Sequence, residues 1–166
     1  MFSFKDGEER VALKYFKQAL SLARKIFDQR KEGNVLGNMG RVYRNMGKTK
    51  RAVEYFQRAL HIHRLIDNPR GEATSFSNLG LAYQDMGELK QAQENMTLSL
   101  EITRNIGDRY AEAIRAWNLG LVLEQLGQHI DAISLMQNAL DFDHSIGKID
   151  PEKVNHLAEL RRQERK

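Results

Sequence analysis

Hydrophobic side chains recur at steps of three and four residues along most of the chain, the spacing of helices that bury one face. Val35, Met39, Val42 and Met46 follow this spacing, and Gly47 comes next as a residue able to end a helix with positive φ. No stretch alternates with a period of two for more than a few residues, so no strands are expected. The pattern predicts an all-α fold with helices near 8–29, 32–46, 49–66, 71–86, 89–106, 110–126, 129–146 and 151–164.

The same pattern repeats with an offset of 40 residues. Asn78-Leu79-Gly80 recurs as Asn118-Leu119-Gly120 and, with one change, as Asn38-Met39-Gly40. The offset also aligns Tyr43, Tyr83 and Leu123, then Gly47, Gly87 and Gly127, then Ala52, Ala92 and Ala132, then Leu60, Leu100 and Leu140. Each unit is therefore a pair of helices joined by a turn, and the chain is built from repeated units.

The repeats divide the chain into an array over 1–150 and a C-terminal capping helix over 151–166. The array comprises an N-terminal half repeat and three full repeats, which span about 7–30, 31–70, 71–110 and 111–150. A glycine inside a helix costs about 1 kcal/mol relative to alanine. We therefore expect Gly40, Gly80 and Gly120 to allow close packing, each facing the small residue Ala52, Ala92 or Ala132 of the following helix.

These spacings resemble the tetratricopeptide repeat. The shared features are Asn-Leu-Gly, a tyrosine three residues after the glycine, a second glycine seven after it and an alanine twelve after it. The period of 40 is similar to that of LGN-type adaptors, kinesin light chains and many bacterial regulators, whereas 34 is usual. The resemblance implies an α-solenoid that coils as a right-handed superhelix, with the first helix of each unit lining a concave wall.

The resemblance also implies which side chains face a ligand, by their distance from each glycine. The positions are Asn34, Asn38, Arg41, Arg44, Asn45, Thr74, Asn78, Leu81, Gln84, Asp85, Ile114, Trp117, Asn118, Leu121, Glu124 and Gln125. Trp117, the single tryptophan, is either an exposed anchor for a partner or packing between repeats two and three.

Two groups of these residues have alternative interpretations. Asn38, Asn78 and Asn118 lie one repeat apart and can hydrogen-bond the backbone of an extended peptide, or they hold neighbouring helices together. Arg41 and Arg44 either bind a carboxylate or phosphate of a partner, or remain solvated or paired within the chain. The lysines and arginines that co-chaperone repeats use to bind a C-terminal carboxylate are incomplete, which disfavours that class of ligand.

Composition and charge indicate which kinds of partner and cellular location to expect. The formal net charge is +4, but basic residues are spread among 22 acidic ones and only the terminal RRQERK is dense, so no nucleic-acid partner is expected. No apolar run approaches a membrane span, and no secretory signal is evident. The absence of cysteine fits a reducing compartment, and a cytoplasmic location is the default.

No residue pattern indicates catalysis, a metal or a cofactor. His61 and His63 point to different sides of a helix, and the other histidines lack partners at useful spacing. The sequence thus predicts a non-enzymatic scaffold that binds a peptide or protein in its concave groove. The alternative is a self-associating or regulatory segment of a larger sensor or regulatory assembly.

The N-terminal half repeat provides the surface for such self-association. Ala12, Phe16 and Ala19 would pack on a first helix that this unit lacks, so we expect them to be partly uncovered. Phe2 and Phe4 could fold back over them. Otherwise the edge docks onto another chain as a weak homo-oligomer, or the sequence is a fragment of a longer array.

Overall fold

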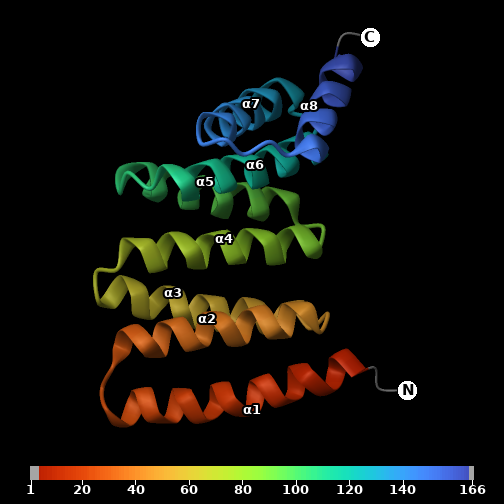
Figure 1. Cartoon of the computed structure of the whole chain (residues 1–166). Coiled ribbons are helices and arrows are strands. Elements are labelled where there is room, and N and C mark those ends of the chain that lie inside the picture. The colour runs from red at the N-terminus through yellow and green to blue at the C-terminus, as the bar shows by residue number, and fades with distance from the viewer. Residues whose placement is uncertain (1–3, 165–166) are drawn as a thin grey trace.

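The computed structural model describes the backbone of residues 4–164 and the side chains of residues 7–164. Within this part the chain forms helices and no strand, stacked from α1 at one end to α8 at the other (Figure 1). The elements are α1 (Phe4–Lys25), α2 (Gln29–Asn45), α3 (Thr49–Leu65), α4 (Pro69–Asp85), α5 (Leu89–Asn105), α6 (Arg109–Gln125), α7 (His129–Ser145) and α8 (Pro151–Glu164). The predicted all-α repeat solenoid is confirmed.

The first junction lies earlier than predicted. α1 ends at Lys25 rather than near residue 29, and α2 begins at Gln29 rather than 32. Phe27 breaks the helix with φ 55°, and the Asp28 carboxylate caps α2 by accepting from the backbone N–H of Lys31 at 2.9 Å. No glycine or proline marks this break, so the helical spacing alone could not locate it.

The mid-helix glycines pack closely, but mainly against a different residue from the one expected. A Cβ atom on Gly80 would lie 2.5 Å from Met96 Cγ, and only 3.2 Å from the Ala92 carbonyl oxygen. On Gly40 it would lie 2.5 Å from the ring of Phe56, and Ala52 is not among its nearest contacts. Each glycine therefore makes room for the large buried side chain sixteen residues later. The alanine of the following helix is a secondary contact, made through its backbone carbonyl oxygen at Ala92 and Ala132.

Buried side chains form two clusters along the stack. One joins α1 to α4 around Leu36, Phe56 and Phe76, and the other joins α5 to α8 around Met96 and Met136. Half-buried Tyr83 of α4 packs against both clusters. The apolar core thus continues through the stack, as expected when each helix pair completes the core of its neighbour.

Ion pairs on the surface repeat with the same period as the core. Arg24–Glu32, Arg64–Glu72 and Arg104–Glu112 each join the end of one unit to the start of the next, at 2.8, 2.7 and 2.9 Å. Such partly exposed pairs contribute about 0–1 kcal/mol each. They mark the repeat register without holding the fold together.

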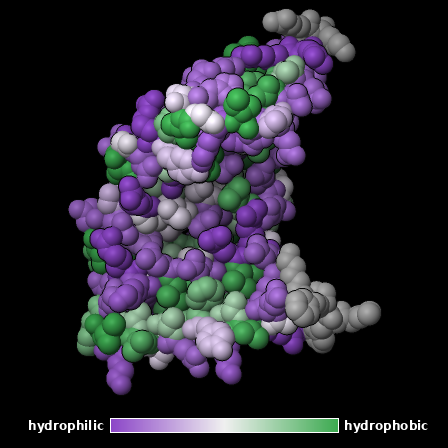
Figure 2. Space-filling view, viewed as in Figure 1, coloured by the Kyte–Doolittle hydropathy of each residue, from purple (hydrophilic) through white to green (hydrophobic). Residues whose placement is uncertain are grey.

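The outward face of α1 is apolar. Val11, Tyr15 and Leu22 are 53%, 64% and 58% exposed, and the hydrophobic colour gathers at this end of the molecule (Figure 2). Ala12 and Phe16 are half-buried and Ala19 is exposed, which confirms that they are partly uncovered. The expectation for Phe2 and Phe4 falls on side chains outside the described part. Among the described helices, none is long and apolar enough to cross a bilayer.

Candidate functional site

The predicted site residues lie on α2, α4 and α6 and differ in exposure. Those exposed are Asn34, Asn38, Arg41, Asn45, Thr74, Asp85, Ile114 and Gln125. Those half-buried are Arg44, Asn78, Leu81, Gln84, Asn118, Leu121 and Glu124. Trp117 alone in this set is buried, at 9% exposure. The candidate surface is therefore most exposed over α2.

A cavity of about 520 Å³ lies between α2 and α4. The predicted residues that line it are Asn34, Asn38, Arg41, Thr74 and Asn78. The structure thus brings together five predicted side chains from two successive repeats in one concave site.

The sequence analysis missed the other lining residues, and three of these have titratable side chains, namely Arg30, His63 and Arg70. Arg30 and Arg70 occupy the same position in two successive repeats, so the 40-residue register carried a signal that could have found them. His63 comes from a second helix, α3, and no rule confined to first helices would include it.

Most of the predicted polar groups in the cavity have no partner within the protein. Among the described residues, the side chains of Asn34, Asn38, Asn78 and Arg41 make no hydrogen bond or ion pair. An asparagine amide carries two donors and an acceptor, and an arginine carries five donors. The cavity therefore presents unused hydrogen-bonding groups from two helices to solvent or to a ligand.

Thr74 differs because its hydroxyl is already occupied. It donates to the Arg70 carbonyl oxygen at 2.9 Å and accepts from Arg115 Nη2 at 3.4 Å. Arg115 also donates through Nε to the buried Ser99 hydroxyl at 2.8 Å, and burial lowers the pKa of its guanidinium. Thr74 thus belongs to a polar network that joins α4, α5 and α6.

His63 forms one wall of the cavity, 4% exposed, between two glycines. A Cβ on Gly33 or Gly71 would lie 2.7 or 2.4 Å from its ring. The Asn68 side-chain oxygen accepts from the Gly71 N–H at 3.3 Å, which turns its amide nitrogen toward His63 Nδ1 at 3.0 Å. Because that nitrogen only donates, Nδ1 accepts and the imidazole is neutral with its proton on Nε2.

The candidates at the carboxyl ends of α2, α4 and α6 bond across the repeats. Arg44 binds Asp85 through Nε at 2.5 Å and Nη2 at 3.1 Å. Gln84 Nε2 donates to Gln125 Oε1 at 3.2 Å, one repeat further along. Arg44 is therefore paired within the chain, and Arg41 three residues earlier is the arginine left open to a ligand.

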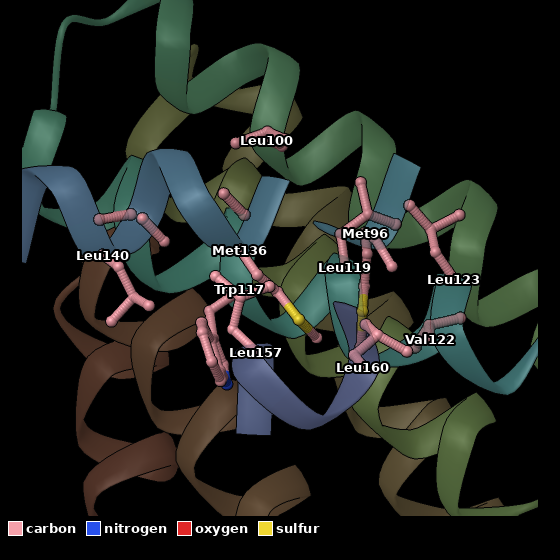
Figure 3. Close-up of a cluster of buried hydrophobic side chains, with 14 of the residues drawn as sticks. Met96, Leu100, Trp117, Leu119, Val122, Leu123, Met136, Leu140, Leu157 and Leu160 are labelled. Atoms are coloured by element: carbon pink, nitrogen blue, oxygen red, sulfur yellow. The ribbon is translucent and has the colours of Figure 1, made fainter. Parts of the chain in front are cut away.

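The C-terminal helix covers part of α6. Trp117 packs beside Leu157 of α8 (Figure 3), with Lys153 Nζ 5.2 Å and the His156 ring 6.0 Å from its ring. His156 Nε2 also lies 2.7 Å from Glu124 Oε2. Trp117 is thus covered rather than an exposed anchor, and its packing partner is α8 in addition to the neighbouring helices.

The described side chains of the cavity have the chemistry of a binding site. Among residues 7–164, no group of three or more histidine or acidic side chains is placed to hold a metal ion. The cavity offers amides, arginines and one neutral histidine, which suit recognition of a polar ligand.

The chain belongs to the tetratricopeptide repeat family, whose sequence model matches residues 1–64 and 71–143. Members of this family generally act as scaffolds for protein–protein interaction. No curated protein sequence matches the chain.

Several solved structures share the fold. BtubC (BKLC) from P. vanneervenii superposes with a TM-score of 0.84 at 20% identity, over 94% of this chain and 66% of that one. The apo form of RapI gives 0.84 at 19% identity, over 96% and 45%. A putative kinesin light chain from Podosopora anserina gives 0.72 at 16% identity, over 95% and 81%. The chain thus spans less than two thirds of the first two proteins.

Proposed function

We propose that the protein is a non-enzymatic scaffold that binds an extended peptide, or an extended segment of a protein, along α2, α4 and α6. The observation that carries the proposal is the cavity between α2 and α4, lined by Asn34, Asn38, Asn78 and Arg41, whose side chains have no hydrogen-bond or ion-pair partner in the part of the chain that the structure describes. An extended peptide exposes backbone N–H and C=O groups at regular intervals, and asparagine amides satisfy both. The family assignment supports the same conclusion.

The proposed contacts are unequal along the surface. Asn34, Asn38, Asn45, Asn78, Leu81, Asn118 and Leu121 contact the ligand directly, and Arg44, Gln84, Asp85, Glu124 and Gln125 border it while they bond one another or α8. Thr74 contributes through its hydrogen-bond network with α5 and α6. Trp117, covered by α8, packs beneath the proposed binding surface. The ligand therefore lies mainly over the first two full repeats.

A random nonapeptide library displayed on phage tests this proposal. We expect the full chain to enrich a common peptide motif, and the double variant Asn38→Ala/Asn78→Ala to bind the enriched peptide at least roughly tenfold more weakly. Each lost hydrogen bond is worth about 0.5–1.5 kcal/mol. Asn155→Ala, at an exposed asparagine of α8, is the matched control. Enrichment of no peptide, or equal binding by the double variant, would refute peptide binding in this groove.

Self-association through α1 is the second candidate function, favoured by the exposed Val11, Tyr15 and Leu22. Contiguous apolar surface of this kind marks interaction sites in soluble proteins. Light scattering across a concentration series should show a rising mass that Tyr15→Glu/Leu22→Glu abolishes. Phe16→Glu is less informative, because half-buried Phe16 also packs against the core. A constant monomeric mass would exclude this candidate and leave groove binding unaffected.

A further inference from the structure

The cavity between α2 and α4 is lined by positively charged side chains and by a glycine that leaves open space. Arg30, Arg41 and Arg70 line it, and no carboxylate is among its described lining residues. Arg70 is compensated by Asp108 at 3.2 Å. Among the described residues, Arg30 and Arg41 form no ion pair. The charge of Arg41 is therefore unpaired among the described residues, whereas Arg30 feels the nearby Asp28 carboxylate without forming an ion pair with it.

Gly37 leaves space beside these arginines without any packing reason. It lies in the interior of α2, where glycine costs about 1 kcal/mol relative to alanine. A Cβ at this position would meet no atom within 4 Å, unlike one on Gly40 in the same helix. The equivalent positions in the next repeats carry Ser77 and Trp117, so the inner surface is most open at Gly37.

We propose that this cavity recognises an acidic side chain of the bound peptide, whose carboxylate sits over Gly37 and pairs with Arg41, while Arg30 further along α2 adds positive charge to the same cavity. The inference rests on the proposed function, since it assigns the ligand chemistry of the same groove. Arginine presents a planar fork of donors that matches the two oxygens of a carboxylate. The Asn38 and Asn78 amides then bind the peptide backbone on either side of the acidic residue.

The distribution of charge favours one acidic residue over a polyanion. Beyond the cavity, Arg44 is neutralised by Asp85, Gln84 bonds Gln125, and Glu124 lies against His156. A nucleic acid needs cationic groups spaced along its phosphates. Within the predicted concave surface, Arg30 and Arg41 form no ion pair among the described residues and both line one cavity, which suits a single carboxylate on an otherwise polar or neutral segment.

The phage-displayed nonapeptide library also tests this inference, through the residue types enriched. The full chain should enrich Asp or Glu at one fixed position of the motif. Changing that residue to its amide should weaken binding at least tenfold at low salt, and Arg41→Glu should shift enrichment toward Lys or Arg. Lys90→Glu, an equal charge change at an exposed site on α5, is the control and should retain the acidic motif.

Gly37→Ala separates recognition from folding. Because the added methyl group has open space, we expect unchanged or higher thermal stability, together with at least fivefold weaker binding of the acidic peptide. Peptides enriched without an acidic position, but dependent on Asn38 and Asn78, would overturn this inference and leave the proposed function standing. Enrichment of no peptide would overturn both. Competition by a homopolymeric RNA at equal potency would overturn the inference in favour of a polyanion site.

Discussion

Phe27 is a bulky residue in a backbone conformation that suits glycine. Its φ is 55°, and its side chain is 89% exposed, so no packing offsets the strain. The equivalent position two repeats later is Gly107, with φ 71°. Left-handed backbone costs a non-glycine residue about 1–2 kcal/mol. The junction between α1 and α2 therefore stores strain that the junction between α5 and α6 avoids.

We predict that Phe27→Gly raises the free energy of unfolding by about 1 kcal/mol, because it relieves this strain without losing a buried contact. Gly107→Ala should lower it by a similar amount. Urea denaturation followed by circular dichroism measures both changes. Phe27→Ala is the control, since it removes the exposed ring but keeps the strained φ. If Phe27→Ala stabilised the protein as much as Phe27→Gly, strain would not be the cause.

His63 gives the protein a defined response to acid. Burial, followed by the nearby charge of Arg30, lowers the pKa of His63 below its ordinary value. The unfolded chain therefore takes up this proton more readily than the folded protein does. The stabilisation from neutral His63 is complete above its unfolded pKa, near 6.5, and is lost as the pH falls through that value toward the folded pKa.

We predict that the wild type loses stability between pH 7.5 and 5 more steeply than His63→Gln. A protonated Nδ1 would face the donating amide of Asn68 and disturb the cap of α4. Glutamine keeps an acceptor but does not titrate. Denaturation midpoints measured across this pH range provide the test, with His61→Gln, at an exposed site on the same helix, as the control. Parallel pH profiles for wild type and His63→Gln would contradict it.

At the scale of a helix, two glycines of α2 differ in what an added methyl group would contact. Gly40 and Gly37 lie one turn apart in α2, but only Gly40 faces a buried ring, that of Phe56. Overpacking a core costs about 1–3 kcal/mol, more than alanine gains in helix propensity. We predict that Gly40→Ala destabilises the protein by about 1–2 kcal/mol and that Gly37→Ala stabilises it by up to about 1 kcal/mol.

Thermal and urea denaturation of these two variants measure the difference. The double variant Gly40→Ala/Phe56→Leu is the control, because a smaller side chain at 56 should make the methyl group at 40 less costly. Equal effects of alanine at positions 37 and 40 would show that propensity, rather than contact with Phe56, determines the cost.

The repeat register explains what could be predicted at this scale. The helices and their pairing followed from the 40-residue offset, since every unit repeats the same apolar spacing. The end of α1 could not be predicted from this offset, because Phe27 occupies the position that is Asp67 or a glycine in the other repeats. Likewise, register identified Asn38 and Asn78 in the cavity, whereas the pairing of Arg44 with Asp85 depends on how neighbouring helices are offset in space.

At the scale of the whole molecule, the two ends of the array are unlike. α1 presents an apolar face at one end, whereas at the other end α8 buries Leu157 and Leu160 and ends in a basic turn. The packing of this helix covers Trp117 on the last full repeat. Sequence position left open whether Trp117 is an exposed anchor or packing, and only the packing of α8 reveals that it is covered.

Trp117 is the sole tryptophan, so its fluorescence reports whether α8 is docked. We predict that Leu157→Ala lowers stability by about 2–5 kcal/mol, the range for truncating a buried leucine, and shifts native emission to longer wavelength. Iodide should then quench Trp117 more strongly while the helical signal of α1 to α7 persists, because units of a repeat array open separately. Val154→Ala, at a more exposed site on α8, should change neither property. Unaltered emission and quenching in Leu157→Ala would show that α8 does not protect Trp117.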